Sequence, residues 1–409
     1  MTRYGLYGIA GVYNFGCEAI VRGIAKTLKD CDAGCEIVYF SPNYAYDSAR
    51  LRDLDIEVRE IGAADPLPKK VLRKGLSWLG AERRPLRIDI ADLVRDIDVL
   101  VSIGGDIYTL PSHDLAQRTY PYYNHLIDVC DRVIDKGIPV VLYGASVGPF
   151  GSYEKAVDYY RRALGRYAAI LCRERGSLSY LGQLGLADNV AFLPDPAFSV
   201  QAQDASTHEL AGQIGVNLSP LSFRQLIGDG RKEAAVAAAT ELVEGVLANF
   251  SEDVLFVPHV LSPNENDNDE AFLRRVYDRL KEPDRARVRF ADTSQGFLGV
   301  KAQLLQCSFL VTARMHCAIN ALHEGVPTLL LSYSQKSQGM CEYVYGSREW
   351  VVPLQSGSEA ILRKMKLMEE RAPELREQLT ARMEAIGEES AALAAELFAE
   401  GRFVDTMGT

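Results

Sequence analysis

Short apolar runs, each typical of a buried strand, alternate with amphipathic stretches typical of helices through most of this 409-residue chain. Such alternation predicts a parallel sheet covered by helices on both faces, because parallel strands need long crossover connections. The first series of predicted strands is 4–9, 35–40, 99–103, 139–143, 169–172 and 190–193. The predicted helices between these strands are 17–29, 117–136, 152–165 and 174–184.

The alternation stops at a polar segment and then starts again. Residues 201–212 follow a proline-flanked turn at Asp195, and we interpret them as an interdomain linker. Beyond this linker the predicted strands are 215–218, 254–257, 288–290, 309–312 and 328–332, and the predicted helices are 231–249, 270–280, 297–306 and 315–324. The sequence therefore predicts two doubly wound α/β domains, 1–200 and 213–355, facing a ligand cleft at the carboxyl ends of their strands.

The tail, residues 356–409, is rich in Ala, Glu, Leu and Arg and predicts C-terminal helices that pack back across the domains. Its apolar residues recur at helical spacing, as in Leu375, Leu379, Met383 and Ile386. Pro373 and Gly387 divide the tail into separate predicted helices. The short heptads also leave open a coiled-coil contact, and with it a homo-oligomer.

Composition excludes several classes of protein. A net charge of −10 argues against nucleic acid as a partner. The eight cysteines are scattered without a Cys-x-x-Cys pair, which fits reduced cytoplasmic thiols and predicts no metal site. No signal-peptide pattern and no apolar run of membrane-spanning length is present, so we expect a cytoplasmic protein.

One segment departs from the acidic balance. Residues 69–87 hold seven Lys or Arg side chains against one acid, Glu82, and Leu72, Leu76 and Leu79 fall on one helical face. This pattern is typical of a helix that lies on anionic lipid, so peripheral contact with the inner face of the membrane is one interpretation. The alternative is an ordinary surface helix whose leucines pack on the core.

The strongest candidate site follows the predicted strand 309–312. Arg314 and His316, two residues apart, begin a predicted helix, where unpaired N–H groups, including that of Met315, and the helix dipole favour an anion. The arginine adds a strong anion ligand, and the histidine adds a group that can carry a proton. This combination predicts chemistry on a substrate that bears phosphate or carboxylate.

A glycine-rich turn follows the first predicted strand. Gly8, Gly11 and Gly16 allow the backbone to approach a ligand closely, and Asn14 and Glu18 offer hydrogen bonds. The spacing is not Gly-x-Gly-x-x-Gly, so a dinucleotide site is not indicated. Turn chemistry alone is the structural alternative.

Other polar residues and two glycines follow predicted strands in the same way, at the edge where ligands bind in such sheets. These are Gly104, Gly105, Asp106, Arg173, Ser177, His259 and Lys336. For Arg173 a structural pair with Glu174 is the alternative, and for Asp195 a structural role is favoured by the flanking prolines. The Asn- and Asp-rich segment 264–270 lacks the glycine and ligand spacing of a calcium loop.

A set of short motifs occurs in order along the chain: Asn14-x-Gly16-Cys17-Glu18-Ala19, Gly104-Gly105, Gly144-x-x-x-Gly148-Pro149, Arg173-Glu174-x-x-Ser177, Leu184-Gly185, Asp195-Pro196-Ala197-Phe198, Arg314-Met315-His316 and Tyr333-x-x-Lys336. This ordered set resembles the polysaccharide pyruvyl transferase family over roughly residues 4 to 345. Family members often have Asp where this chain has Cys17 and Leu where it has Met315, and the first departure affects the acceptor contacts.

The resemblance implies a two-domain architecture like the GT-B glycosyltransferases. It also implies transfer of the pyruvyl carbons of phosphoenolpyruvate onto two sugar hydroxyls in a cell-surface or exopolysaccharide precursor, with a ketal and phosphate as products. In this interpretation the N-terminal domain holds the acceptor, which would be free or lipid-linked, and the C-terminal domain holds phosphoenolpyruvate. No cofactor beyond that donor is implied.

The implied roles follow from charge. Arg173 and Arg314 would bind the phosphate and carboxylate of the donor, and His316 would protonate its methylene carbon. Glu18 and His259 are candidates for the base. Two other functions remain open: a GT-B glycosyltransferase that uses a nucleotide sugar, and a catalytically inactive glycan-binding protein.

Overall fold

The chain forms two compact units in a computed structural model that describes residues 1–62, 89–110, 115, 122–202, 212–228, 230–332 and 336–398. Unit 1 contains the described residues of Met1–Val12, Ile20–Pro196 and Ser390–Thr409, and unit 2 contains those of Tyr13–Ala19 and Ala197–Glu389. The segment 69–87 and most of the predicted linker lie outside the described residues.

Unit 1 is built on a seven-stranded parallel sheet with the order β3-β2-β1-β4-β5-β6-β7. The strands are β1 (Arg3–Tyr7), β2 (Glu36–Ser41), β3 (Glu57–Glu60), β4 (Val99–Ile103), β5 (Val140–Ala145), β6 (Ala169–Cys172) and β7 (Val190–Phe192). All six strands predicted for this half are present, and β3 is added at the sheet edge.

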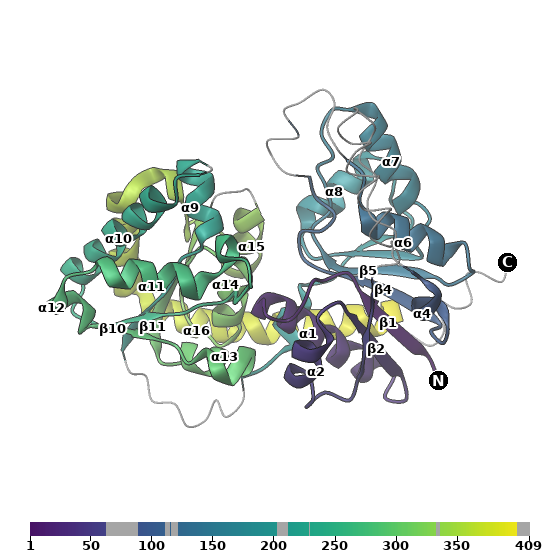
Figure 1. The fold of residues 1–409 in the computed structure, drawn as a ribbon, viewed down its shortest axis with the longest axis horizontal. Helices are drawn as coiled ribbons and strands as arrows, with labels where there is room; N and C mark the ends of the chain where they lie inside the picture. The colour runs from purple at the N-terminus through teal and green to yellow at the C-terminus, as the bar shows by residue number, and fades with distance from the viewer. Residues whose placement is uncertain are drawn as a thin grey trace. The chain divides into compact units, whose positions relative to one another are not determined.

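Helices cover the sheet of unit 1. Those wholly within this unit are α2 (Tyr44–Arg50), α4 (Ala91–Val94), α6 (His125–Ile134), α7 (Glu154–Leu164) and α8 (Arg175–Gln183). One core cluster joins buried residues of the strands to buried faces of α6, α7 and α8, which lie together in Figure 1. The side chain of Asn124 caps α6 by accepting the N–H of Leu126.

Unit 2 repeats this architecture with a six-stranded parallel sheet of order β10-β9-β8-β11-β12-β13. The strands are β8 (Gln213–Asn217), β9 (Val254–Phe256), β10 (Val288–Phe290), β11 (Cys307–Thr312), β12 (Thr328–Ser332) and β13 (Val351–Pro353). The helices are α9 (Pro220–Ile227), α10 (Lys232–Asn249), α11 (Asp269–Arg279), α12 (Glu282–Arg285), α13 (Gly296–Leu304), α14 (Met315–His323) and α15 (Lys336–Tyr345). The prediction of two doubly wound α/β domains is confirmed.

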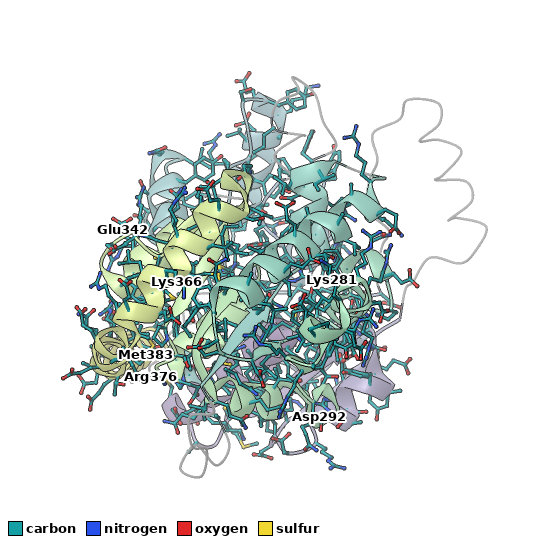
Figure 2. All side chains as sticks on the ribbon, turned by 90° about the vertical axis from the view of Figure 1, so that its left-hand side faces the viewer. Lys281, Asp292, Glu342, Lys366, Arg376 and Met383 are labelled. Atoms are coloured by element: carbon teal, nitrogen blue, oxygen red, sulfur yellow. The ribbon has the colours of Figure 1, made fainter. Side chains whose placement is uncertain are left out.

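The described part of the C-terminal tail contains one long helix, α16 (Gly357–Phe398), of 42 residues. The prediction of separate helices divided at Pro373 and Gly387 is therefore wrong for this part of the tail. A proline inside a helix removes one backbone hydrogen bond. Apolar residues on both sides of Pro373, from Ile361 to Ile386, pack on the core of unit 2 and keep the helix continuous. Lys366, Arg376 and Met383 mark α16 in Figure 2.

The boundary between the units differs from the predicted one near the N-terminus. Residues Tyr13–Ala19, which we assigned to the first domain, belong to unit 2. The N–H of Phe15 donates to the carbonyl of His259 at 3.0 Å, and the N–H of Leu261 donates to the carbonyl of Tyr13 at 2.9 Å. These bonds attach the start of α1 (Phe15–Cys31) to the chain that follows β9. Local patterning gives no sign of this contact, because the partners are far apart in sequence.

Candidate active site

The start of α14 carries the Arg-x-His motif as predicted. β11 ends at Thr312, Arg314 is the N-cap with extended backbone, and no side chain caps the helix. The first N–H groups of a helix have no intrahelical partner, so the start of α14 favours an anion. The side chains of Arg314 and His316 are half-buried.

Gly16 packs directly against His316, within unit 2. A Cβ atom built on Gly16 would lie 2.7 Å from the Cβ and ring atoms of His316, which is closer than real Cβ contacts. The side chain of Asn14 accepts the N–H of Gly16 at 3.0 Å and so holds this turn at the start of α1. We predicted that Gly16 lets the backbone approach a ligand; in the structure the close approach is to the imidazole of His316.

Gly16→Ala is therefore expected to displace His316 and, for a reaction that uses this histidine, to lower kcat by about 10²-fold, the typical effect of a small misplacement. The measurement is steady-state kinetics on Gly16→Ala beside Gly182→Ala. Gly182 lies in α8 with no atom within 4 Å of an added Cβ, so its variant controls for a glycine-to-alanine change itself. Equal activity of the two variants would contradict a role for the Gly16 contact.

Arg314 is held by two aspartates on the segment after β9. Its Nη2 lies 2.6 Å from Asp267 Oδ1 and 2.8 Å from Asp269 Oδ1, and its Nε lies 3.2 Å from Asp269 Oδ1. Its Nη1 makes no hydrogen bond to any residue that the structure describes, which leaves that end of the guanidinium for a ligand. The partners orient the arginine beside the start of α14.

Asp269 is fully buried and is the centre of this cluster. Besides Arg314, it accepts hydrogen bonds at 3.2 Å from the N–H groups of His259 and Val260 and from the side chain of Asn217. Burial raises the pKa of the Asp269 carboxyl, and the Arg314 guanidinium with these donors opposes that shift. Neither Asp267 nor Asp269 was among the predicted site residues, although both lie in the Asn- and Asp-rich segment that we noted.

His259 is 2% exposed, and its Nε2 lies 2.9 Å from the side-chain nitrogen of Asn320. Its ring meets the ring of Phe15 edge to face, with 5.9 Å between centroids. Burial lowers the pKa of His259 well below its usual value, helped by the nearby His316 and Arg314. A neutral His259 ring that accepts a hydrogen bond from the Asn320 side chain is suited to positioning its neighbours. It is poorly suited to act as a base, because its pKa is lowered. Glu18, the other candidate base, is also buried.

A second cluster lies in unit 1 around Arg173. Its Nη1 contacts Asp195 Oδ2 at 2.9 Å, its Nη2 contacts Asp106 Oδ1 at 2.8 Å, and its Nε donates to Ser146 Oγ at 3.0 Å. Gly105 allows this packing, since an added Cβ would lie 2.9 Å from Arg173 Nη1. The sequence correctly grouped residues 104–106 with Arg173 at the strand ends, but it missed that Asp195 is a partner of the arginine.

Ser177 orders the loop after β5. Its hydroxyl accepts the N–H of Val147 at 2.8 Å and donates to Glu174 Oε1 at 3.0 Å. Lys336 is the first residue of α15, and its side chain lies outside the described part of the structure. Arg173 belongs to unit 1 and Arg314 to unit 2.

No group of three or more His, Cys, Asp or Glu side chains among the described residues is arranged to hold a metal ion. Within the same described part of the chain, no helix combines the length and the apolar character needed to cross a bilayer.

Comparison with solved structures relates the fold to enzymes that handle nucleotide sugars. The UDP-GlcNAc 2-epimerase of Neisseria meningitidis bound to UDP-GlcNAc matches with a TM-score of 0.57 and 11% identity, over 98% of this chain and 99% of that one. UGT71G1 of Medicago truncatula complexed with UDP-glucose matches with a TM-score of 0.58 and 11% identity, over 100% of this chain and 98% of that one. At such identities the likeness shows the fold alone, which is GT-B-like.

Sequence comparison is more specific. The amylovoran biosynthesis protein AmsJ of Erwinia amylovora is 23% identical over 261 residues, which are 61% of this chain and 60% of AmsJ. The model of the family described as polysaccharide pyruvyl transferase matches residues 14–335, which include both the start of α1 and the start of α14. This chain therefore belongs to the polysaccharide pyruvyl transferase family.

Proposed function

We propose that this protein transfers the pyruvyl group of phosphoenolpyruvate onto two hydroxyls of one sugar in an exopolysaccharide precursor. The methylene carbon of the donor gains a proton while the first hydroxyl adds to the neighbouring carbon. The second hydroxyl then forms the second C–O bond at that carbon as the bond to phosphate breaks. Of the two hydroxyl protons, one balances that taken up by the new methyl group and one leaves with inorganic phosphate.

The observation that carries the proposal is the start of α14. This helix N-terminus has no side-chain cap, and it carries Arg314, which Asp269 orients, and the half-buried His316. All of these lie inside the region matched by the family model. The N–H groups and Arg314 Nη1 suit the charges of phosphoenolpyruvate, and His316 is the proton donor to the methylene carbon. The relationship to AmsJ supports a polysaccharide precursor as the acceptor.

The base that accepts the second hydroxyl proton is proposed to be Glu18. It lies in the first turn of α1, two residues after Gly16, which contacts His316. His259, whose Nε2 accepts from Asn320, is proposed to position this region rather than to titrate.

The test is direct incubation of the protein with a glycan-precursor extract and either phosphoenolpyruvate or a panel of nucleotide sugars. The proposal expects release of inorganic phosphate only with phosphoenolpyruvate, and a pyruvate ketal detected on the glycan by mass spectrometry. Glycosyl transfer from a nucleotide sugar without ketal formation would identify a glycosyltransferase instead. Binding of the glycan without turnover of either donor would identify a glycan-binding protein.

Activity is expected to persist in excess EDTA, because Arg314 and helix N–H groups are proposed to neutralise the leaving phosphate. The measurement is phosphate release with and without the chelator. Loss of activity that is restored by magnesium or manganese would show that a metal ion takes part.

A further inference from the structure

A pocket of about 570 Å³ lies within unit 2 and is distinct from the start of α14. Its walls come from α9, the start of α10, the segment that leads into α11, and α11 itself. The lining residues are Pro220, Arg224, Gly230, Arg231, Lys232, Ala235, Glu265, Asn266, Ala271, Phe272, Arg274 and Arg275. α9 follows β8 and residues 265–266 follow β9, so the pocket lies at the edge where ligands bind in doubly wound sheets.

The charge of the lining is unlike that of the whole chain. Five of the lining residues are basic and one, Glu265, is acidic, whereas the chain has a net charge of −10. Two outside acids pair with the lining: Glu270 with Arg274, and Glu233 with Arg275. Basic side chains still outnumber acidic ones when these two are counted. Lys232 makes no ion pair with any residue in the described part of the chain.

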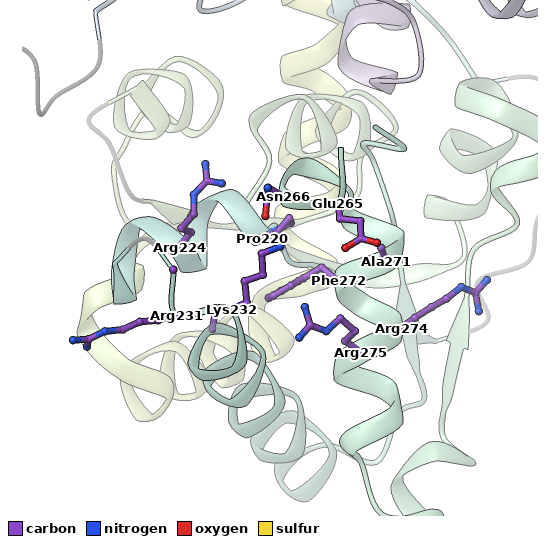
Figure 3. A pocket seen from close by; sticks show the side chains of 12 residues that line it. Pro220, Arg224, Arg231, Lys232, Glu265, Asn266, Ala271, Phe272, Arg274 and Arg275 are labelled. Atoms are coloured by element: carbon purple, nitrogen blue, oxygen red, sulfur yellow. The ribbon is translucent and has the colours of Figure 1, made fainter. Parts of the chain in front are cut away.

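The side chains differ in direction, as Figure 3 shows. Lys232 and Arg275 point into the space beside Phe272, whereas Arg231 and Arg274 point away from it. Phe272 is buried and offers a flat apolar wall. Glu265 lies on the opposite side of the pocket from Arg231 and could accept hydroxyl hydrogen bonds from a ligand.

Backbone groups add to the attraction for an anion. α10 is 18 residues long, and its N-cap residue, Arg231, makes no side-chain capping bond. Lys232 is the first residue of α10. The first N–H groups of this helix and the positive end of its dipole therefore attract an anion at the same place as the ammonium group of Lys232. Gly230, with φ of 80°, forms the turn before this helix. The pocket thus combines cations, helix N–H groups and an aromatic wall.

We propose that this pocket binds a phosphate-bearing ligand, with Lys232 and Arg275 on its phosphate and Phe272 against its apolar part. A nucleoside diphosphate and a lipid-linked diphosphate share this chemistry. The inference rests on the pocket alone and does not require the proposed pyruvyl transfer.

The experiment is isothermal titration of the full chain with three probes: inorganic pyrophosphate, uridine diphosphate and farnesyl diphosphate. We expect pyrophosphate to bind, and Lys232→Gln and Arg275→Gln each to weaken that binding about tenfold, the usual loss of one charge-assisted hydrogen bond. Lys281→Gln is the matched control, since Lys281, labelled in Figure 2, belongs to the same unit and is not among the residues that line the pocket. Circular dichroism of each variant verifies folding.

The other two probes identify the source of the phosphate. Tighter binding of uridine diphosphate than of pyrophosphate indicates a nucleotide, and tighter binding of farnesyl diphosphate indicates a lipid carrier. The proposal is overturned if no probe binds, or if both pocket variants bind as the wild type does. It is also overturned if excess phosphoenolpyruvate displaces the probes or if His316→Gln removes their binding, because the probes would then occupy the start of α14.

Discussion

Replacing His316 with Gln is expected to lower kcat by about 10² to 10⁴-fold, the usual contribution of a general acid. Glutamine keeps hydrogen-bonding capacity and similar size, but it cannot deliver the proton that we propose His316 gives to the methylene carbon of phosphoenolpyruvate. KM for phosphoenolpyruvate is expected to change little, because Arg314 and the helix N–H groups remain. The measurement is steady-state phosphate release with an accepted glycan.

His125→Gln serves as the control, since His125 is exposed at the first residue of α6 in unit 1. Wild-type kcat in His316→Gln would end the assignment of this histidine as the acid. A large rise in KM with unchanged kcat would make it a donor-binding residue instead.

Replacing Asp269 with Asn is expected to destabilise the protein by about 3–5 kcal/mol, the usual effect of removing one partner of a buried ion pair. The carboxylate is 0% exposed and accepts from Arg314, two backbone N–H groups and Asn217. An asparagine offers one oxygen and presents an NH₂ group to the remaining donors, and the charge of Arg314 loses its buried partner. Urea unfolding measures the change.

Asp267→Asn is the matched comparison, because it removes the other partner of the same arginine. The Asp267 side chain is 41% exposed, so solvent compensates for its loss and a change of about 0–1 kcal/mol is expected. Equal destabilisation by the two variants would show that Asp269 is no more important to the fold than its exposed neighbour.

Alternating apolar and amphipathic segments were enough to predict both sheets, apart from one edge strand in each. β3 reads Glu-Val-Arg-Glu, and it is half-exposed at the edge of its sheet, so it carries too little apolar character to be recognised. β13 is a three-residue edge strand, Val-Val-Pro, which is too short to show a period. Edge strands are stabilised by one neighbouring strand, and that partnership does not show in their own sequence.

For the candidate site, the sequence predicted the residues at the helix start but not the contacts that position them. Arg314 and His316 follow a strand and begin a helix, which is a local pattern, and the structure has them there. The ion pairs of Arg314 with Asp267 and Asp269 join segments that are distant in sequence, so spacing could not reveal them. The contact between Gly16 and His316 is of the same kind. Sequence patterns identified which residues stand at helix starts, but not which side chains hold them.

The attachment of Tyr13–Ala19 to unit 2 also bears on how the chain is made and divided. These residues leave the ribosome long before His259 and Leu261, to which they bond, so their attachment to unit 2 can form only after that later segment has been synthesised. A gene fragment that starts after Pro196 would encode His316 without the glycine that packs on it. Only a permuted gene, with the first residues of α1 linked to the remainder of unit 2, would encode that unit in one piece.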